Sequence, residues 1–478
     1  MQISTPTPWK IGRTDAPLPE KAAGGMPLIG NLLDIKNDPV RYVVEQYQRL
    51  GPIFRIVMLG KEITVLVGRE ALQFAATPEA TEIFSLQESY GGLEEQVGPV
   101  ILSMRGEQHR HYRKLARPSH SRSQASAHIA DLLQVVDAFI DTLRVGDSFN
   151  PLMPIRRIIS TQLGMMMLNR PPGAYFEHFV KFSTYMLYVY QFGMWPHFML
   201  KTPAFKRAKA KVMQMLEELI DFHQRVPAGS ERPHDALDEI MEALDANGAP
   251  YNRATLLATA MGPYIAGMDT ASGTINFIAY ALHKHSEVLD DLRAEVRTLY
   301  AQQAVPSADA FKDLVTLNGA IDETMRRYPL VPFLPRTALA PFEFNGRRVD
   351  AGTPLFIATT ATHFFPEYYP DPYRFDIRRE RGPSGTFNPY GFGAHSCLGA
   401  GLGEILIQIL ISRLIQRVDF ELDPPDFQAT MQALPVPNPG NFRLKVIAKH
   451  AQARTSTPAD KQTGMFHTPC SYWRRAGG

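Results

Sequence analysis

The amino-acid sequence predicts a mainly α-helical protein with a minor β region, folded as a single large domain. Three observations support this prediction. Residues 105–330 show helical periodicity over most of their length, and two other regions carry the signals of β-hairpins. Hydrophobic residues make up 45% of the 478 positions and charged residues 21%, as is typical of a globular protein with a large buried core.

Two hairpins account for most of the predicted β region. Residues 53–68 contain two β-favouring runs separated by Gly60-Lys61, which predicts a hairpin at that point. A second hairpin is expected at Asn345-Gly346, because this dipeptide tolerates the positive φ angles of a type I′ turn.

The helical region is expected to contain one unusually long helix. The three most regular helical patterns cover residues 252–285, 286–300 and 399–417. We expect an extended N-terminal arm at residues 1–25, a large domain at residues 26–450 and a polar C-terminal tail at residues 451–478.

Bulk composition excludes several classes of protein. The formal net charge of +2 is too small to indicate a nucleic-acid partner. Two cysteines, Cys397 and Cys470, cannot form a disulfide framework, which favours a reducing compartment. The N-terminus lacks the apolar run of a signal peptide, and residues 185–200, the most apolar stretch, are interrupted by polar residues and Pro196. We therefore expect a cytoplasmic protein without a transmembrane anchor, either soluble or peripheral at a membrane surface.

The segment FNPYGFGAHSCLGA at residues 387–400 is the most informative in the chain. Its glycines permit tight turns and close approach of the backbone to a flat ligand. Cys397 precedes a predicted helix, whose unpaired N–H groups favour a thiolate, and a thiolate can be an axial ligand of haem iron. A buried structural cysteine is the ordinary alternative. A dinucleotide-binding loop is excluded, because the later glycines have the wrong spacing and no strand precedes them.

The long predicted helix contains a second candidate site in the segment AGMDT. Ala266, Asp269 and Thr270 are expected on one face, where small residues at Ala266 and Gly267 would leave room for a macrocycle and dioxygen. Thr270 can hydrogen-bond to the carbonyl one turn earlier, and an acid beside a hydroxyl can relay protons. An ordinary Asp-Thr pair on a helix is the alternative interpretation.

The cysteine segment resembles the haem-binding loop of the cytochrome P-450 family, F-x-x-G-x-[RH]-x-C-x-G. Gly393, His395, Cys397 and Gly399 fall at matching positions, whereas Tyr390 replaces the family's leading Phe. The resemblance implies a P-450 fold, in which the long helix lies over haem b (iron protoporphyrin IX). It also implies that Cys397 ligates the iron and that Asp269 and Thr270 serve oxygen activation.

Other segments resemble the same family in the same order along the chain. Glu323 and Arg326 match E-x-x-R, and Arg374 lies in a segment matching P-x-R-F, so these three residues are expected to form a buried structural network behind the haem. Taken alone, the first pair would be an ordinary exposed ion pair on a helix. The residues expected at the haem propionates are His109, Arg113, Arg336 and His395.

The resemblance further implies a hydrophobic small-molecule substrate. Residues 175–205, rich in aromatic side chains and methionine, are expected to form a lid over the active site, although core packing is the ordinary alternative. Further pocket walls are expected at residues 90–104, 331–334 and 435–437.

The electron donor is expected to be a separate protein, a ferredoxin with its reductase or a flavodoxin-type protein. About 80 residues follow Cys397, too few for a flavin or ferredoxin domain. The proposed docking patch for this donor comprises Arg110, Arg113, Lys114 and Arg117, with Arg413 and Arg417 as further members. The alternative interpretation is that these basic residues simply form a solvated helix face.

The sequence thus predicts a haem-dependent monooxygenase that hydroxylates or epoxidises a fatty acid, terpenoid, steroid or polyketide. Two other functions remain open at this point. A haem-thiolate isomerase, dehydratase or oxidative coupling enzyme would use the same scaffold. A non-catalytic haem-binding protein is the third possibility, but it would have no need of Asp269 and Thr270 as a proton relay.

Overall fold

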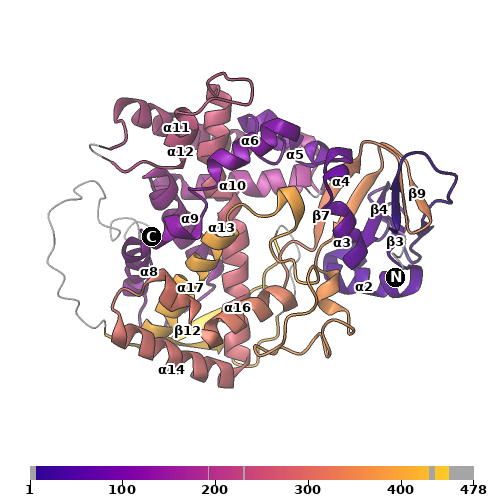
Figure 1. Ribbon diagram of the computed structural model, residues 1–478. Coiled ribbons are helices and arrows are strands. Elements are labelled where there is room, and N and C mark those ends of the chain that lie inside the picture. Colours follow the sequence, from indigo (N-terminus) through magenta and orange to yellow (C-terminus); the bar gives the residue numbers. More distant parts are fainter. Residues whose placement is uncertain (1–6, 192, 230–231, 430–435, 452–478) are drawn as a thin grey trace, which may run out of the picture.

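The computed structural model describes residues 7–191, 193–229, 232–429 and 436–451, and it shows a mainly helical protein with a smaller β region. In Figure 1 the helices occupy most of the molecule, and β3, β4, β7 and β9 gather beside the N-terminal helices α2 and α3. The long helix α13 (Arg253–Lys284) passes through the middle of the helical part. The predicted fold class is confirmed.

The largest sheet contains the first predicted hairpin, which is confirmed. Strands β3 (Ile53–Met58) and β4 (Lys61–Val67) pair antiparallel, and Met58 lies opposite Lys61. The turn is therefore Leu59-Gly60, one residue earlier than expected, and both residues have positive φ angles. The sheet order is β2-β3-β4-β10-β7-β5. Its other strands are β2 (Glu20–Lys21), β5 (Phe84–Ser85), β7 (Phe333–Ala338) and β10 (Pro354–Ala358).

The second predicted hairpin is also confirmed. Strands β8 (Phe342–Phe344) and β9 (Arg347–Val349) are joined by Asn345 and Gly346, with φ angles of 49° and 70° as a type I′ turn requires. Strand β1 (Trp9–Ile11) of the N-terminal arm pairs with β8, so part of the arm is tied into a sheet. A third sheet has the order β11-β12-β6, with strands Val418–Asp423, Arg443–Lys449 and Ser148–Phe149.

The three most regular helices lie close to their predicted bounds. Helix α13 begins after Asn252, whose side chain accepts a hydrogen bond from the Thr255 N–H as an N-cap. Helix α14 spans Ser286–Gln302 and α17 spans Ala400–Arg417. The C-terminal tail expected at residues 451–478 lies outside the described residues after position 451.

The remaining helices surround α13 and the sheets. Those before the central helix are α1 (Leu32–Asn37), α2 (Pro39–Leu50), α3 (Arg69–Ala75), α4 (Pro78–Ile83), α5 (Gln87–Val97), α6 (Gly106–Ala116), α7 (Arg122–Ser126), α8 (Ile129–Thr142), α9 (Leu152–Leu168), α10 (Phe176–Met186), α11 (Pro203–Arg225) and α12 (Ala236–Met241). Those after it are α15 (Ala308–Lys312) and α16 (Val315–Arg327). Short helical turns include the π-helix η2 (Leu187–Gln191), which continues α10, and the 3-10 turn η5 (Gly393–His395).

The main core forms where α13 packs on α9. Gly164 of α9 is required for this contact, because a Cβ atom there would lie 2.7 Å from the Tyr264 ring and would also overlap the Arg170 carbonyl. The Tyr264 hydroxyl donates to the Arg170 carbonyl at 2.6 Å, which satisfies this fully buried phenol. Close packing of α13 fixes the position of its AGMDT segment relative to the cysteine loop that precedes α17.

None of the described helices is both long enough and apolar enough to cross a membrane.

Candidate active site

The cysteine loop is folded by two glycine turns. Gly391 and Gly393 have φ angles of 71° and 64°, a region that favours glycine. A Cβ atom at Gly393 would lie 3.2 Å from Ala76 Cα, so the loop rests directly on the residue that ends α3. The Cys397 N–H donates to the Tyr390 carbonyl at 2.8 Å, which closes the loop, and the Cys397 side chain remains accessible.

The surroundings of Cys397 oppose ionisation of its thiol when the protein is considered alone. Burial by neighbouring atoms raises the pKa of the Cys397 thiol, while the Gly399 N–H and the Arg113 charge lower it by less. Helix α17 begins only at Ala400, so the expected help from its N-terminus is small. An accessible sulfur of this kind is held as a thiolate by a cationic partner such as a metal ion.

Four basic side chains converge beside the cysteine loop. The rings of His109 and His395 lie 4.1 Å apart, Arg336 is buried, and the Arg113 guanidinium donates to the Ser396 carbonyl at 2.7 Å. Burial lowers the pKa of Arg336 to about 10. Burial, followed by the charges of His109 and Arg336, lowers the pKa of His395 to about 3.

These four groups have no anionic partner among the residues that the structure describes. No ion pair links any of them to a carboxylate there, and His395 Nδ1 is buried without a hydrogen bond. Arg336 is a buried cation, which normally requires a paired charge, and the other three groups can donate hydrogen bonds, so this arrangement fits a ligand that brings its own carboxylates. The structure thus brings together His109, Arg113, Arg336 and His395, as the sequence predicted.

On α13, Ala266 and Thr270 are exposed, whereas most of the helix is buried. The Thr270 hydroxyl donates to the Ala266 carbonyl at 2.8 Å, which is the predicted hydrogen bond to the preceding turn. The two residues therefore present an open stretch of helix surface carrying one hydroxyl group.

Asp269 lies differently from the prediction. Its carboxylate is buried in an ion pair with Arg156 of α9, at 2.7 Å, and it accepts a hydrogen bond from Ser183 of α10, at 2.9 Å. It therefore faces the helices behind α13 rather than the open surface beside Thr270. Arg156 and Ser183 were missed by the sequence analysis, because they lie far away in the chain and match no motif.

The sequence analysis explained glycine at position 267 as making room for a macrocycle, and this explanation is wrong. A Cβ atom at Gly267 would overlap the Leu163 side chain of α9. The residue is small because α9 and α13 approach closely there. By contrast, a Cβ atom at Gly399 would meet nothing within 4 Å, so the surface beside Cys397 is open as expected.

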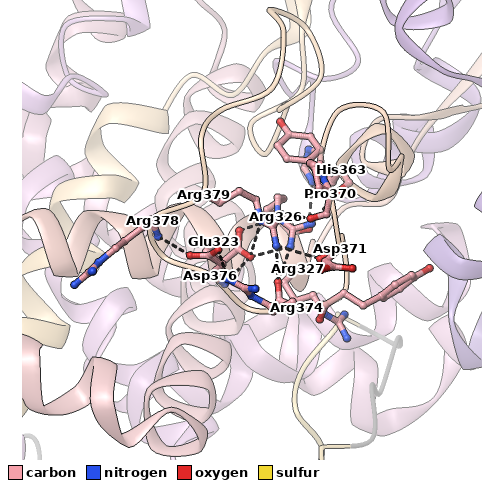
Figure 2. Close-up of polar contacts among 12 residues, drawn as sticks. Glu323, Arg326, Arg327, His363, Pro370, Asp371, Arg374, Asp376, Arg378 and Arg379 are labelled. Carbon is pink, nitrogen blue, oxygen red and sulfur yellow. Dashed lines mark hydrogen bonds and ion pairs between the residues drawn. The ribbon is translucent and has the colours of Figure 1, made fainter.

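The network behind the cysteine loop contains Glu323 and Arg326, as predicted (Figure 2). Both side chains are only 3% exposed, and the Arg326 guanidinium makes two hydrogen bonds to the Glu323 carboxylate, at 2.7 and 2.8 Å. The prediction that the Arg374 guanidinium would join them is wrong. The Arg374 side chain is 68% exposed and forms an ion pair with Asp376, whereas the Arg379 side chain donates to Glu323 at 3.3 Å. Arg374 contributes its carbonyl, which accepts from Arg379 at 2.9 Å.

The network reaches the cysteine loop through His363, another residue that the sequence analysis missed. Arg326 donates to the His363 carbonyl at 2.8 Å, and the Asn388 N–H donates to His363 Nε2 at 3.0 Å. Burial lowers the pKa of His363 to about 3, so the ring stays neutral and its Nε2 is free to accept this bond. Glu323 and Arg326 thereby hold the start of the loop that carries Cys397.

The expected docking patch is smaller than predicted. Arg413 and Arg417 are buried and share the Asp137 carboxylate of α8, so they cannot contact a partner protein. Arg113 points toward the cysteine loop. Arg110, Lys114 and Arg117 remain exposed on and directly after α6.

The predicted lid is divided between core and surface. The α10 side chains Phe176, Phe179 and Phe182 are fully buried in the core, as the ordinary interpretation expected, whereas Phe198 is exposed. Of the expected wall at residues 435–437, position 435 lies outside the described residues.

Comparison with known proteins identifies the class of this protein as a cytochrome P-450 monooxygenase. The cytochrome P-450 family model matches residues 20–445, and the chain belongs to that family. The cyclooctat-9-en-7-ol 5-monooxygenase of Streptomyces melanosporofaciens is 24% identical over 86% of this chain and 89% of that protein. The sterol 14α-demethylase of Mycolicibacterium vanbaalenii is 22% identical over 85% and 92%. A solved cyanobacterial P-450 with retinoic acid bound has the same fold, with a TM-score of 0.78 and 23% identity over 91% and 100% of the chains.

Proposed function

We propose that the protein holds haem b through Cys397 and inserts one oxygen atom from dioxygen into a hydrophobic small molecule. The observation that supports this proposal most directly is the accessible Cys397 sulfur beside four basic groups that have no carboxylate partner in the described part of the chain. A porphyrin with iron at its centre and two propionates at its edge satisfies both features.

The residues of this chain would divide the binding of haem between them. Cys397 would ligate the iron, and the open surfaces at Gly399 and Ala266 would admit the macrocycle. His109, Arg113, Arg336 and His395 would bind the propionates. Bound haem supplies the iron at which dioxygen is reduced and activated.

Protons would be delivered by Thr270 and Asp269. The Thr270 hydroxyl lies on the open surface of α13 and holds its own proton on the Ala266 carbonyl. Asp269 is turned toward Arg156 and Ser183, so transfer to Thr270 requires its carboxylate to rotate out of this ion pair. The ion pair thus holds the carboxylate away from the open surface of α13 between turnovers.

The proposed substrate is a lipophilic molecule such as a terpenoid, steroid, fatty acid or polyketide. A terpenoid monooxygenase and a sterol demethylase are among the relatives, and a structural neighbour has retinoic acid bound. The apolar pocket wall proposed at residues 90–104 includes Leu93, Val100 and Ile101, which are partly buried and pack against the main core. We further propose a cytoplasmic protein that receives electrons from an acidic ferredoxin or flavodoxin at Arg110, Lys114 and Arg117.

A spectrum of the reduced, haem-loaded protein with carbon monoxide tests thiolate ligation. We expect the long-wavelength Soret band of thiolate-ligated haem in the wild type and in Cys470→Ser, and its loss in Cys397→Ser. The band in Cys397→Ser, or no haem uptake by the wild type, would refute the proposal. Oxygen-dependent product formation with a surrogate reductase would then separate the monooxygenase from isomerase or dehydratase activity.

A further inference from the structure

A cavity of about 620 Å³ lies between helix α14 and the third sheet. Its volume is within the range of about 300–1,000 Å³ that is typical of small-molecule sites. Figure 1 shows α14 and β12 at the bottom of the view, whereas α6, which carries His109 and Arg113, lies at the top. Along α13, His283 at the cavity is thirteen residues beyond Thr270, which corresponds to about 20 Å. The cavity is therefore separate from the candidate active site.

The two walls of the cavity are a face of α14 and the strand β11. On α14, Leu289, Arg293 and Arg297 line the cavity at every fourth position, which places them on one helix face. Four consecutive residues of β11, 419–422, form the opposite wall. Because β11 is the end strand of its sheet, its outer N–H and C=O groups face no further strand among those that the structure describes. This edge can therefore contribute backbone hydrogen bonds to a ligand.

The floor of the cavity is apolar. Leu289 of α14, together with Phe420 and Leu422 of β11, lines the cavity, and each of the three is only 5% exposed. Burial lowers the pKa of His283, whose ring also lines the cavity, so this residue adds no charge near neutral pH. An apolar group placed on this floor would be removed from water at no electrostatic cost.

Most charged groups of the cavity are already paired with one another. Arg293 forms ion pairs with Asp290 at 2.9 Å and with Asp419 at 3.6 Å. The Asp419 carboxylate also accepts a hydrogen bond from His450 Nε2 at 2.9 Å. These groups therefore have partners within the protein and do not require a ligand.

Arg297 of α14 and Glu421 of β11 are the two exceptions. Both line the cavity and both are exposed, and neither makes an ion pair or a hydrogen bond with any residue that the structure describes. They belong to opposite walls, so the cavity presents one unpaired cation and one unpaired anion above an apolar floor. A ligand that carries both charges could pair with both residues at once.

We propose that this cavity binds a free amino acid with an apolar side chain. The α-carboxylate pairs with Arg297 and the α-ammonium group pairs with Glu421. The apolar side chain lies on the floor formed by Leu289, Phe420 and Leu422. A purely anionic ligand would instead be repelled by Glu421, and a purely cationic ligand by Arg297. This inference does not rest on the proposed function, because the cavity lies away from the candidate haem site.

Three probes that share a phenyl ring test whether both charges are recognised. L-Phenylalanine carries both charges, 3-phenylpropanoate lacks the ammonium group, and phenethylamine lacks the carboxylate. Isothermal titration calorimetry of the haem-loaded protein, with the iron saturated by imidazole, should show phenylalanine binding about tenfold more tightly than either other probe. Equal affinity for the three probes, or no binding of phenylalanine, would overturn the proposal.

Substitution of the two unpaired charges tests whether the amino acid binds in this cavity. Arg297→Gln should weaken phenylalanine binding about tenfold and leave phenethylamine binding unchanged. Glu421→Gln should weaken phenylalanine binding to a similar extent and leave 3-phenylpropanoate binding unchanged.

The matched control is Arg378→Gln, at an exposed arginine that does not line the cavity, and it should bind phenylalanine as the wild type does. Because Arg297 and Glu421 are exposed and unpaired, their substitution should leave the free energy of unfolding unchanged. Wild-type affinity for phenylalanine in either cavity variant, or an equal loss of affinity in the control, would overturn the proposal.

Discussion

At the residue scale, the candidate site depends on side chains held by partners from distant parts of the chain. Asp269 is an example, since its orientation is set by Arg156 and Ser183 rather than by its own helix. His363 is another, since it transmits the position of Arg326 to Asn388 at the start of the cysteine loop. Each of these two residues leads to a prediction about the stability of the protein.

Removal of Arg156 should destabilise the protein strongly. In Arg156→Met the Asp269 carboxylate stays buried without its counter-ion, which typically costs about 3–5 kcal/mol of unfolding free energy. The neighbouring variant Arg157→Met is the control, because its partner Glu177 is exposed and the pair should contribute about 1 kcal/mol or less. Denaturant unfolding measures both, and equal losses would contradict the assigned importance of the Asp269 ion pair.

His363 should make the stability of the protein dependent on pH. Its pKa falls from 6.5 to about 3 on folding, so the unfolded chain binds a proton that the folded ring excludes. Stability should therefore fall by about 1.4 kcal/mol per pH unit as the pH drops below 6.5 toward 3, and this contribution is absent above 6.5. Thermal unfolding across this range should show a shallower decline in His363→Gln. An unchanged slope would show that the ring is not held neutral.

At the scale of elements, the contact between α9 and α13 fixes the open surface of the central helix. Gly164 and Gly267 lie on the two sides of this contact. A side chain at Gly164 would overlap the Arg170 carbonyl and Tyr264 of α13, and one at Gly267 would overlap Leu163 of α9. Local patterns predicted the helices themselves, but glycine at these positions has no signature that distinguishes helix packing from approach of a cofactor.

A pair of alanine substitutions tests this contact. Gly164→Ala should destabilise the protein by about 1–3 kcal/mol, because the methyl group meets the Arg170 backbone and the buried Tyr264 ring. Gly262→Ala places a methyl group in open space within α13 and should be neutral or stabilising by up to about 1 kcal/mol. Similar unfolding free energies in the two variants would be inconsistent with the packing described.

At the scale of the whole molecule, burial decides which basic residues are available to a partner. The α17 residues Arg413 and Arg417 are sequestered by Asp137 of α8, whereas Arg110, Lys114 and Arg117 stay exposed near the cysteine loop. The proposed docking surface is therefore confined to α6 and its end.

Charge reversal tests the docking surface. The double variant Arg110→Glu and Arg117→Glu should slow reduction by an acidic electron donor about tenfold at low ionic strength, with unchanged haem content. The corresponding reversal of Arg297 and Arg378, both exposed elsewhere, should have little effect. Stopped-flow reduction measures both, and equal rates in the two double variants would exclude α6 as the docking site.

Local sequence patterns were enough to predict the helical class, the Asn345-Gly346 hairpin, the bounds of α13 and the segment containing Cys397. These features depend on periodicity, turn propensity and short motifs, which act within a few residues of one another. The prediction that His109, Arg113, Arg336 and His395 converge came only from the order in which segments resembling the family occur along the chain.

The tertiary structure decided which groups meet. It placed Arg379 rather than the Arg374 side chain on Glu323, turned Asp269 toward Arg156, and buried Arg413 and Arg417 on Asp137. The partners in the last two cases lie more than 100 residues apart, and an arginine carries the same local signal whether it faces solvent or a buried carboxylate. The choice is made by the free energy of burying a charge, which depends on every element packed around it.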